Sequence, residues 1–150
     1  MKYSSFTSEH LAHEHSYKNV LSYLYEQNEF MESIGNMVDI GCQKQALDLH
    51  WWASAEYNDD TNTPLDIKCI GVNDIESIRA THKSISFQRQ DIQNFNKNKK
   101  NFDVLWCYDT LQFLTNPYHA LSNWWQIANQ DAMLVVAVPQ TTNVTFGALD

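Results

Sequence analysis

Apolar and polar positions alternate along this chain in blocks that predict strands and helices in turn. Five short apolar runs bounded by polar or turn residues read as strands, at residues 37–40, 66–72, 85–90, 102–107 and 132–138. Helical spacing occupies residues 44–57 and resumes after Asp74 and after Asn116–Pro117. Strands that alternate with helices predict a doubly wound α/β fold with a mostly parallel sheet of about five strands.

Three segments carry further structural expectations. Residues 85–90 alternate in polarity and should form an outer strand, whereas residues 132–138 are apolar on both faces and should be central. The helix after Pro117 should bury one face. Its members are expected to be Tyr118, Leu121, Trp124, Trp125 and Ile127.

An apolar stripe in residues 1–35 predicts a helical segment before the α/β domain. Leu11, Val20 and Leu24 follow near-helical spacing, so residues 1–35 are expected to form a helical lead-in that packs on the sheet. The remainder, residues 36–150, is expected to form one Rossmann-like domain. In the first long helix of that domain, one indole of the pair Trp51–Trp52 should face the core and the other a rim, although stacking on a ligand base is an alternative.

Composition and charge narrow the functional classes. The 150 residues are 43% hydrophobic and carry a formal charge of −8, which disfavours nucleic acid as a partner. The basic run Lys97–Lys100 is better explained as a solvated loop than as a binding patch. The N-terminus has no apolar signal core, and no apolar run approaches the roughly 20 residues of a membrane helix. We therefore expect a soluble, cytoplasmic protein.

The cysteines and histidines give no strong metal signal. Cys42, Cys69 and Cys107 form an odd set without a CxxC pair, so buried thiols in a reducing cytosol explain them best. A cluster near the N-terminus contains zinc-ligand residue types, but a solvated helix start is the simpler interpretation, and we predict no metal site. Its members are Glu9, His10, His13, Glu14 and His15.

The stretch that suggests a function is the turn after the first strand. That strand ends on Gly41, where the backbone lets a ligand approach and the next helix turns its free amide groups toward it. Asn73 and Asp74 follow the second strand, where dinucleotide-type folds bind ribose hydroxyls, although Asp74 could equally cap a helix. Asp91–Ile92 follows the third strand and should lie beside the same cleft. The pattern predicts a nucleotide site.

Three motifs in this order resemble the class I S-adenosylmethionine-dependent methyltransferases, nearest the small-molecule group called type 11. They are Val38–Cys42, Phe102–Leu111 and Met133–Pro139, and the resemblance spans residues 34–143. It implies a Rossmann-like fold, S-adenosylmethionine as cofactor, and a small-molecule acceptor that the sequence does not identify. Methyl transfer from a sulfonium needs mainly orientation, so no catalytic dyad is expected.

Carried over by position, the resemblance implies a cofactor site at the strand ends. Asp39 and Gly41 would frame the methionine part of the cofactor, with Cys42 contributing backbone. Asn73 or Asp74 would take the ribose hydroxyls. The remaining positions are Asp91 for the adenine amino group, Ile92 for backbone and apolar contact, and Cys107 and Tyr108 over the sulfonium end.

The chain departs from the family pattern at several points. Gln43 and Gln45 replace further glycines, Gln112–Phe113 stands where many relatives have Glu-His, and Asn129–Ala132 replaces a Pro-Gly-Gly turn. The family also adds two strands after the fifth, so the chain looks incomplete at the C-terminus or truncated. The fifth strand should then be covered by a terminal segment or by another copy of the chain, giving a possible homo-oligomer.

These departures leave two alternatives open. One is a degenerate domain without transfer activity that serves as an interaction or assembly module. The other is a nicotinamide-dependent oxidoreductase, for which the glycine pattern is poorer still.

Overall fold

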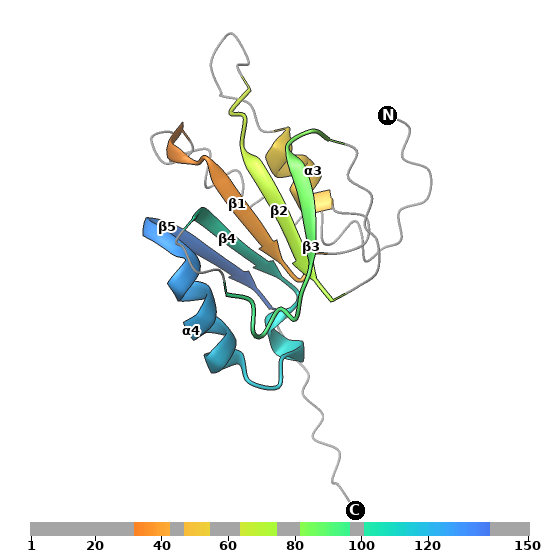
Figure 1. Ribbon diagram of the computed structural model, residues 1–150, viewed down its shortest axis with the longest axis vertical. Coiled ribbons are helices and arrows are strands. Elements are labelled where there is room, and N and C mark those ends of the chain that lie inside the picture. The colour runs from red at the N-terminus through yellow and green to blue at the C-terminus, as the bar shows by residue number, and fades with distance from the viewer. Residues whose placement is uncertain (1–31, 43–46, 55–63, 75–81, 97–100, 139–150) are drawn as a thin grey trace, which may run out of the picture.

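A single parallel sheet organises the protein. The computed structural model describes residues 32–42, 47–54, 64–74, 82–96 and 101–138. The strands run in the order β3-β2-β1-β4-β5, and every neighbouring pair is parallel (Figure 1). Their bounds are β1 Asn36–Ile40, β2 Lys68–Asn73, β3 Ile85–Arg89, β4 Phe102–Tyr108 and β5 Ala128–Ala137. The predicted doubly wound, Rossmann-like sheet is confirmed, and its strand order reverses between β1 and β4.

The two faces of the sheet are covered by different helices. Met37 of β1 packs in a cluster with Leu49 and Trp52 of α3 (Leu47–Ala53). Val38 of β1 packs in a second cluster with Trp124 of α4 (Pro117–Ile127). Successive strand residues point to opposite faces, so the apolar run of β1 is buried on both sides. This explains why an unbroken apolar segment forms the centre of the sheet.

The buried face of α4 differs from the one that the sequence predicts. Tyr118 and Trp125 are 86% and 73% exposed, so their inclusion in the buried face is wrong. The fully buried residues of α4 are Ala120, Trp124 and Ile127. These positions are four and three residues apart and share one side of the helix, whereas Tyr118 and Trp125, seven apart, share another. Leu121 packs against the core at the border of the two faces.

The position of β5 also corrects a prediction. Apolar character on both faces suggested a central strand, but among the described residues β5 lies at an edge, paired only with β4. Met133 and Val135 pack against the core, while Leu134 and Val136 are 43% and 37% exposed. Apolar character on both faces of β5 therefore indicates neither two neighbouring strands nor full cover of both faces. The strand also begins at Ala128, earlier than predicted, through an irregular register opposite Phe102 and Val104.

Several smaller predictions have clear outcomes. β3 is the opposite outer strand, as predicted. Trp52 is buried and Trp51 half-buried beside it, as expected for a core and a rim indole. All three cysteines are buried and free.

No helix among the described residues is long and apolar enough to cross a membrane. Residues 1–31 of the predicted lead-in at 1–35 lie outside the described residues, and so do its histidine cluster, Gln43, Gln45 and Lys97–Lys100.

Candidate functional site

The turn after β1 lies against the segment that follows β4. Gly41 has φ +85°, a conformation that favours glycine, and its amide donates to the Val72 carbonyl at 2.8 Å. A Cβ placed on Gly41 would lie 2.3 Å from Oγ1 of Thr110. The ends of β1 and β4 therefore touch at the point where the strand order reverses. In open α/β sheets, ligands bind beyond the carboxyl ends of the strands at this point.

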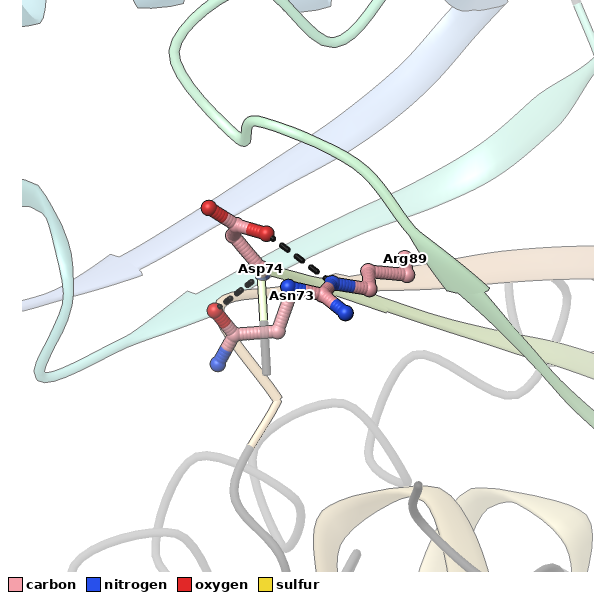
Figure 2. A network of polar contacts seen from close by, with 3 residues as sticks. All are labelled: Asn73, Asp74 and Arg89. Atoms are coloured by element: carbon pink, nitrogen blue, oxygen red, sulfur yellow. Dashed lines mark hydrogen bonds and ion pairs between the residues drawn. The ribbon is translucent and has the colours of Figure 1, made fainter. Parts of the chain in front are cut away.

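Asn73 at the end of β2 holds this turn from the other side. Its Nδ2 donates to the Cys42 carbonyl at 2.9 Å. Its Oδ1 accepts from the Asp74 amide at 2.8 Å (Figure 2). The side chain thus links the ends of β1 and β2. Of the two residues predicted for ribose binding, Asn73 already uses both its carbonyl and its amide group within the protein.

Asp74 projects a carboxylate next to the end of β3. Its Oδ1 lies 3.2 Å from Nε of Arg89, and the two side chains are 70% and 59% exposed (Figure 2). An ion pair this exposed contributes little to stability. Asp74 remains accessible at the carboxyl end of β2. Its carboxylate is therefore suited to accept hydrogen bonds from hydroxyl groups. The helix that it was alternatively predicted to cap would begin at residues 75–81, outside the described residues.

The loop after β3 presents Asp91 in a fixed orientation. Its Oδ1 accepts from the Gln93 amide at 2.9 Å, and its Oδ2 accepts from Nδ2 of Asn94. The next residue, Ile92, is half-buried, and its carbonyl accepts from Nε1 of Trp124 at 2.9 Å. The loop therefore exposes one oriented carboxylate, while Ile92 packs inward against the core. The roles of both residues in adenine binding stay predictions.

Asp39 is a buried acid on the α3 face of the sheet. It is 4% exposed, and burial, aided by the nearby charge of Asp48, raises its pKa well above the ordinary value of 3.8. Asp48 is also buried, and its Oδ2 accepts from Nε1 of Trp106 at 2.8 Å. The sequence interpretation missed Asp48, although an acidic residue in the first turn of the helix after Gly41 was a usable signal.

The thiols near the strand ends are enclosed and protonated. Burial, together with the charge of Asp39, raises the pKa of Cys107 to about 12 and raises that of Cys42 further. Neither thiol is suited to act as a nucleophile. Tyr108 is 8% exposed, and its ring stacks on Trp106 with centroids 6.2 Å apart. Cys107 and Tyr108 thus border the site chiefly through backbone.

Thr110 is the second residue that the sequence interpretation did not single out. It is 8% exposed, and its Oγ1 donates to the Tyr108 carbonyl at 3.0 Å while its side chain fills the space beside Gly41. Its position two residues beyond a strand end was visible in the sequence, but its partner was not. Gln112 and Phe113 lie in the following 3-10 helix η1 (Leu111–Phe113) and are exposed.

The structure brings the predicted residues to one edge of the sheet, at the ends of β1, β2, β3 and β4. A family model described as a methyltransferase domain matches residues 38–136, more than half of the chain. The chain belongs to this family. No curated protein sequence matches it significantly.

Two solved structures of one enzyme share the fold. The plantazolicin methyltransferase BpumL in complex with SAH has a TM-score of 0.58 at 16% sequence identity. The same enzyme with SAH and a triazolic desmethylPZN analog has a TM-score of 0.55 at 15% identity. Each match covers 86% of this chain and 52% of the other, so this methyltransferase-family chain spans about half the length of those proteins.

Two glycines provide a matched test of the turn. Gly41→Ala should lower the free energy of unfolding by roughly 2–4 kcal/mol, because the methyl group adds backbone strain and overlaps Thr110. Gly35→Ala is the control, since its Cβ would meet only Asp103 Oδ2 at 3.6 Å. Urea unfolding of both variants measures the difference. Equal losses of stability would show that the approach of Gly41 to Thr110 is not tight.

Asp39→Asn tests the buried acid through pH. The folded protein keeps a proton on Asp39 above pH 3.8 that the unfolded chain releases. Wild-type stability should therefore fall, relative to the variant, as pH rises from about 4 towards the folded-state pKa, by up to about 1.4 kcal/mol per pH unit. Thermal unfolding of both proteins across this range measures the slope. A constant difference between them would contradict a raised Asp39 pKa.

Proposed function

We propose that this protein is an S-adenosylmethionine-dependent methyltransferase with a small-molecule acceptor. The observation that carries the proposal is the Gly41 turn, which lies at the reversal point of the sheet in a chain of the methyltransferase family. The BpumL structures, which have the same fold and contain SAH, support this choice of cofactor.

The charges at the strand ends fit the cofactor. S-adenosylmethionine carries a sulfonium and an ammonium group against one carboxylate, so acidic surroundings suit it. Asp74 and Asp91 are exposed at the ends of β2 and β3, and Asp109 follows β4 directly with φ +51°. The positive charge of Arg89, at the end of β3, is partly neutralised by Asp74. The residues present therefore fit a cationic nucleoside.

The contacts of each residue suggest how the cofactor would lie. Asp91 would accept from the adenine amino group, with Ile92 alongside. Asp74 is better placed than Asn73 for the ribose hydroxyls, because Asn73 already bonds to Cys42 and to the Asp74 amide. The methionine part would then follow the turn from Gly41 to Cys42.

Three residues would act mainly by shaping the end of the site that receives the methionine part. Asp39 is buried and would keep the turn in place from beneath, while Cys107 and Tyr108 would close the site beside β4. Bound S-adenosylmethionine would supply an activated methyl group, so the protein's own part is to orient the two reactants and keep water away. The buried, protonated thiols are consistent with this positioning role. Free buried cysteines also suit a reducing compartment such as the cytoplasm, where we place the protein.

Calorimetry with S-adenosylhomocysteine tests the proposal without knowledge of the acceptor. The wild-type protein should bind, and Asp91→Asn should weaken binding about tenfold or more, because a hydrogen bond to a charged acceptor is lost. Asp131→Asn is the matched control, with the same charge change at an exposed residue near the start of β5. Absence of binding by a folded wild-type protein at millimolar ligand would refute the proposed function.

A second candidate function is a non-catalytic assembly module. The observation that favours it is β5, whose outer side chains Leu134 and Val136 are partly exposed at an edge of the described sheet. A second copy of the chain could pair there, giving a homodimer. Sedimentation velocity should then detect a dimer that Val136→Lys dissociates. A monomer in solution that binds S-adenosylmethionine and transfers its methyl group would exclude this alternative.

A further inference from the structure

Helix α4 holds the loop that carries Asp91. Trp124 is fully buried and donates from Nε1 to the Ile92 carbonyl at 2.9 Å. The preceding residue, Asn123, donates from Nδ2 to the Gln93 carbonyl at 3.0 Å. Two successive carbonyls of the loop are thus bound by two successive side chains of the helix. The place of Asp91 depends on α4 as well as on β3.

The start of α4 adds a second attachment to the same loop. Oε1 of Gln93 accepts from Oγ1 of Thr115 at 2.8 Å and from the Asn116 amide at 2.9 Å. The amide of Gln93 in turn donates to Oδ1 of Asp91. Gln93 therefore connects the carboxylate to the beginning of the helix through one residue.

A chain of side-chain hydrogen bonds leads from α4 to the other oxygen of Asp91. Asn94 donates from Nδ2 to Oδ2 of Asp91. The Oδ1 atom of the same Asn94 amide points toward His119. Nε2 of His119 lies 3.1 Å from that oxygen. An amide oxygen can only accept, so Nε2 must carry the hydrogen for the chain to be complete. His119, Asn94 and Asp91 then form a continuous donor-to-acceptor sequence.

A competing contact shows that this arrangement has an alternative. Nδ2 of Asn123 lies 3.1 Å from the same Nε2, and its other bond, to the Gln93 carbonyl, fixes it as a donor. Asn123 could bond only to an Nε2 without hydrogen, in which case His119 would no longer donate to Asn94. The tautomer of His119 thus decides whether Asn94 is held.

We propose that His119 is a positioning residue for adenine recognition, acting through Asn94 to fix the carboxylate of Asp91. This inference rests on the proposed function, because it takes Asp91 to accept from the adenine amino group. With one oxygen bound by Asn94 and the other by the Gln93 amide, the carboxylate cannot rotate freely. The directions of its remaining lone pairs are then fixed. His119 itself does not need to touch the cofactor.

The base of the ligand provides a readout of this orientation. S-inosylhomocysteine differs from S-adenosylhomocysteine by a carbonyl oxygen in place of the amino group and by a hydrogen on N1 of the base. An oriented Asp91 carboxylate accepts from the amino group and repels the oxygen, so the wild type should bind the adenosyl ligand about tenfold more tightly or better. A carboxylate that rotates freely discriminates less. The ratio of the two dissociation constants therefore reports the action of His119.

Three substitutions of His119 test whether an N–H at the position of Nε2 is needed, or only a polar side chain. His119→Leu removes the donor, His119→Asn keeps an amide that is too short to reach Asn94, and His119→Gln places an N–H near the reach of Nε2. The backbone amide of His119, which donates to Oδ1 of the helix cap Asn116, is unchanged in all three. Tyr118→Leu is the control, because its exposed side chain lies on the same turn.

Calorimetry of each folded variant with both ligands gives the result. We expect the Leu and Asn variants to lose most of the discrimination through weaker adenosyl binding, and the Gln and Tyr118→Leu variants to keep it. Asn94→Ala should reproduce the loss. An unchanged ratio in His119→Leu and Asn94→Ala, or an equal weakening toward both ligands, would overturn the positioning role. A wild type that binds S-adenosylhomocysteine without discrimination would overturn it and leave the proposed function standing, whereas a wild type that binds neither ligand would overturn both.

Discussion

The close approach of Gly41 to Thr110 is the constraint on which the site depends. No side chain fits between them, since a Cβ on Gly41 would overlap Oγ1 of Thr110. The contact joins the ends of β1 and β4 where the strand order reverses, and Asn73 fixes the same turn to β2 through the Cys42 carbonyl. Three strand ends are thereby held in one arrangement, and a ligand at that edge would meet backbone groups whose positions are fixed before it arrives.

The carboxylates around this turn differ in their environments. Asp39 and Asp48 are buried beneath it, where burial raises the pKa of Asp39. Asp74 and Asp91 are exposed beyond the ends of β2 and β3. Asp48 bonds to Trp106 and so links α3 to the sheet, while the exposed acids remain accessible to a ligand. One residue type has two uses here, and exposure to water separates them.

The sequence was sufficient for much of the fold because periodicity depends on local burial. The five strands, the helix after Pro117 and the outer position of β3 all follow from it. The edge position of β5 did not, because apolar side chains do not show how many strands flank a strand, and Leu134 and Val136 stay partly exposed. The exposure of Tyr118 and Trp125 was missed for a related reason, since aromatic character alone does not select the face of a helix.

The candidate site was accessible from the sequence to the extent that strand ends mark it. Gly41, Asn73 and Asp91 each follow a strand, so their common edge could be predicted, although their binding roles stay predictions. The positions of Asp48 and Thr110 were visible in the same way, but the contacts that make these two residues and His119 matter were not, because their partners lie far along the chain. The bond from Trp106 to Asp48 joins residues 58 positions apart, and the contact between His119 and Asn94 joins residues 25 apart.

The most direct measurement of the central claim is a two-dimensional NMR titration of the labelled protein with S-adenosylhomocysteine. For a cofactor site at the Gly41 turn, we expect the largest amide shifts at the carboxyl ends of the strands, at Gly41, Asp74 and Ile92. Amides at the opposite ends, such as those of Gly35 and Lys68, should change little. Shifts confined to that opposite edge or to β5, or no shifts at all at saturating ligand, would contradict a cofactor site at the Gly41 turn.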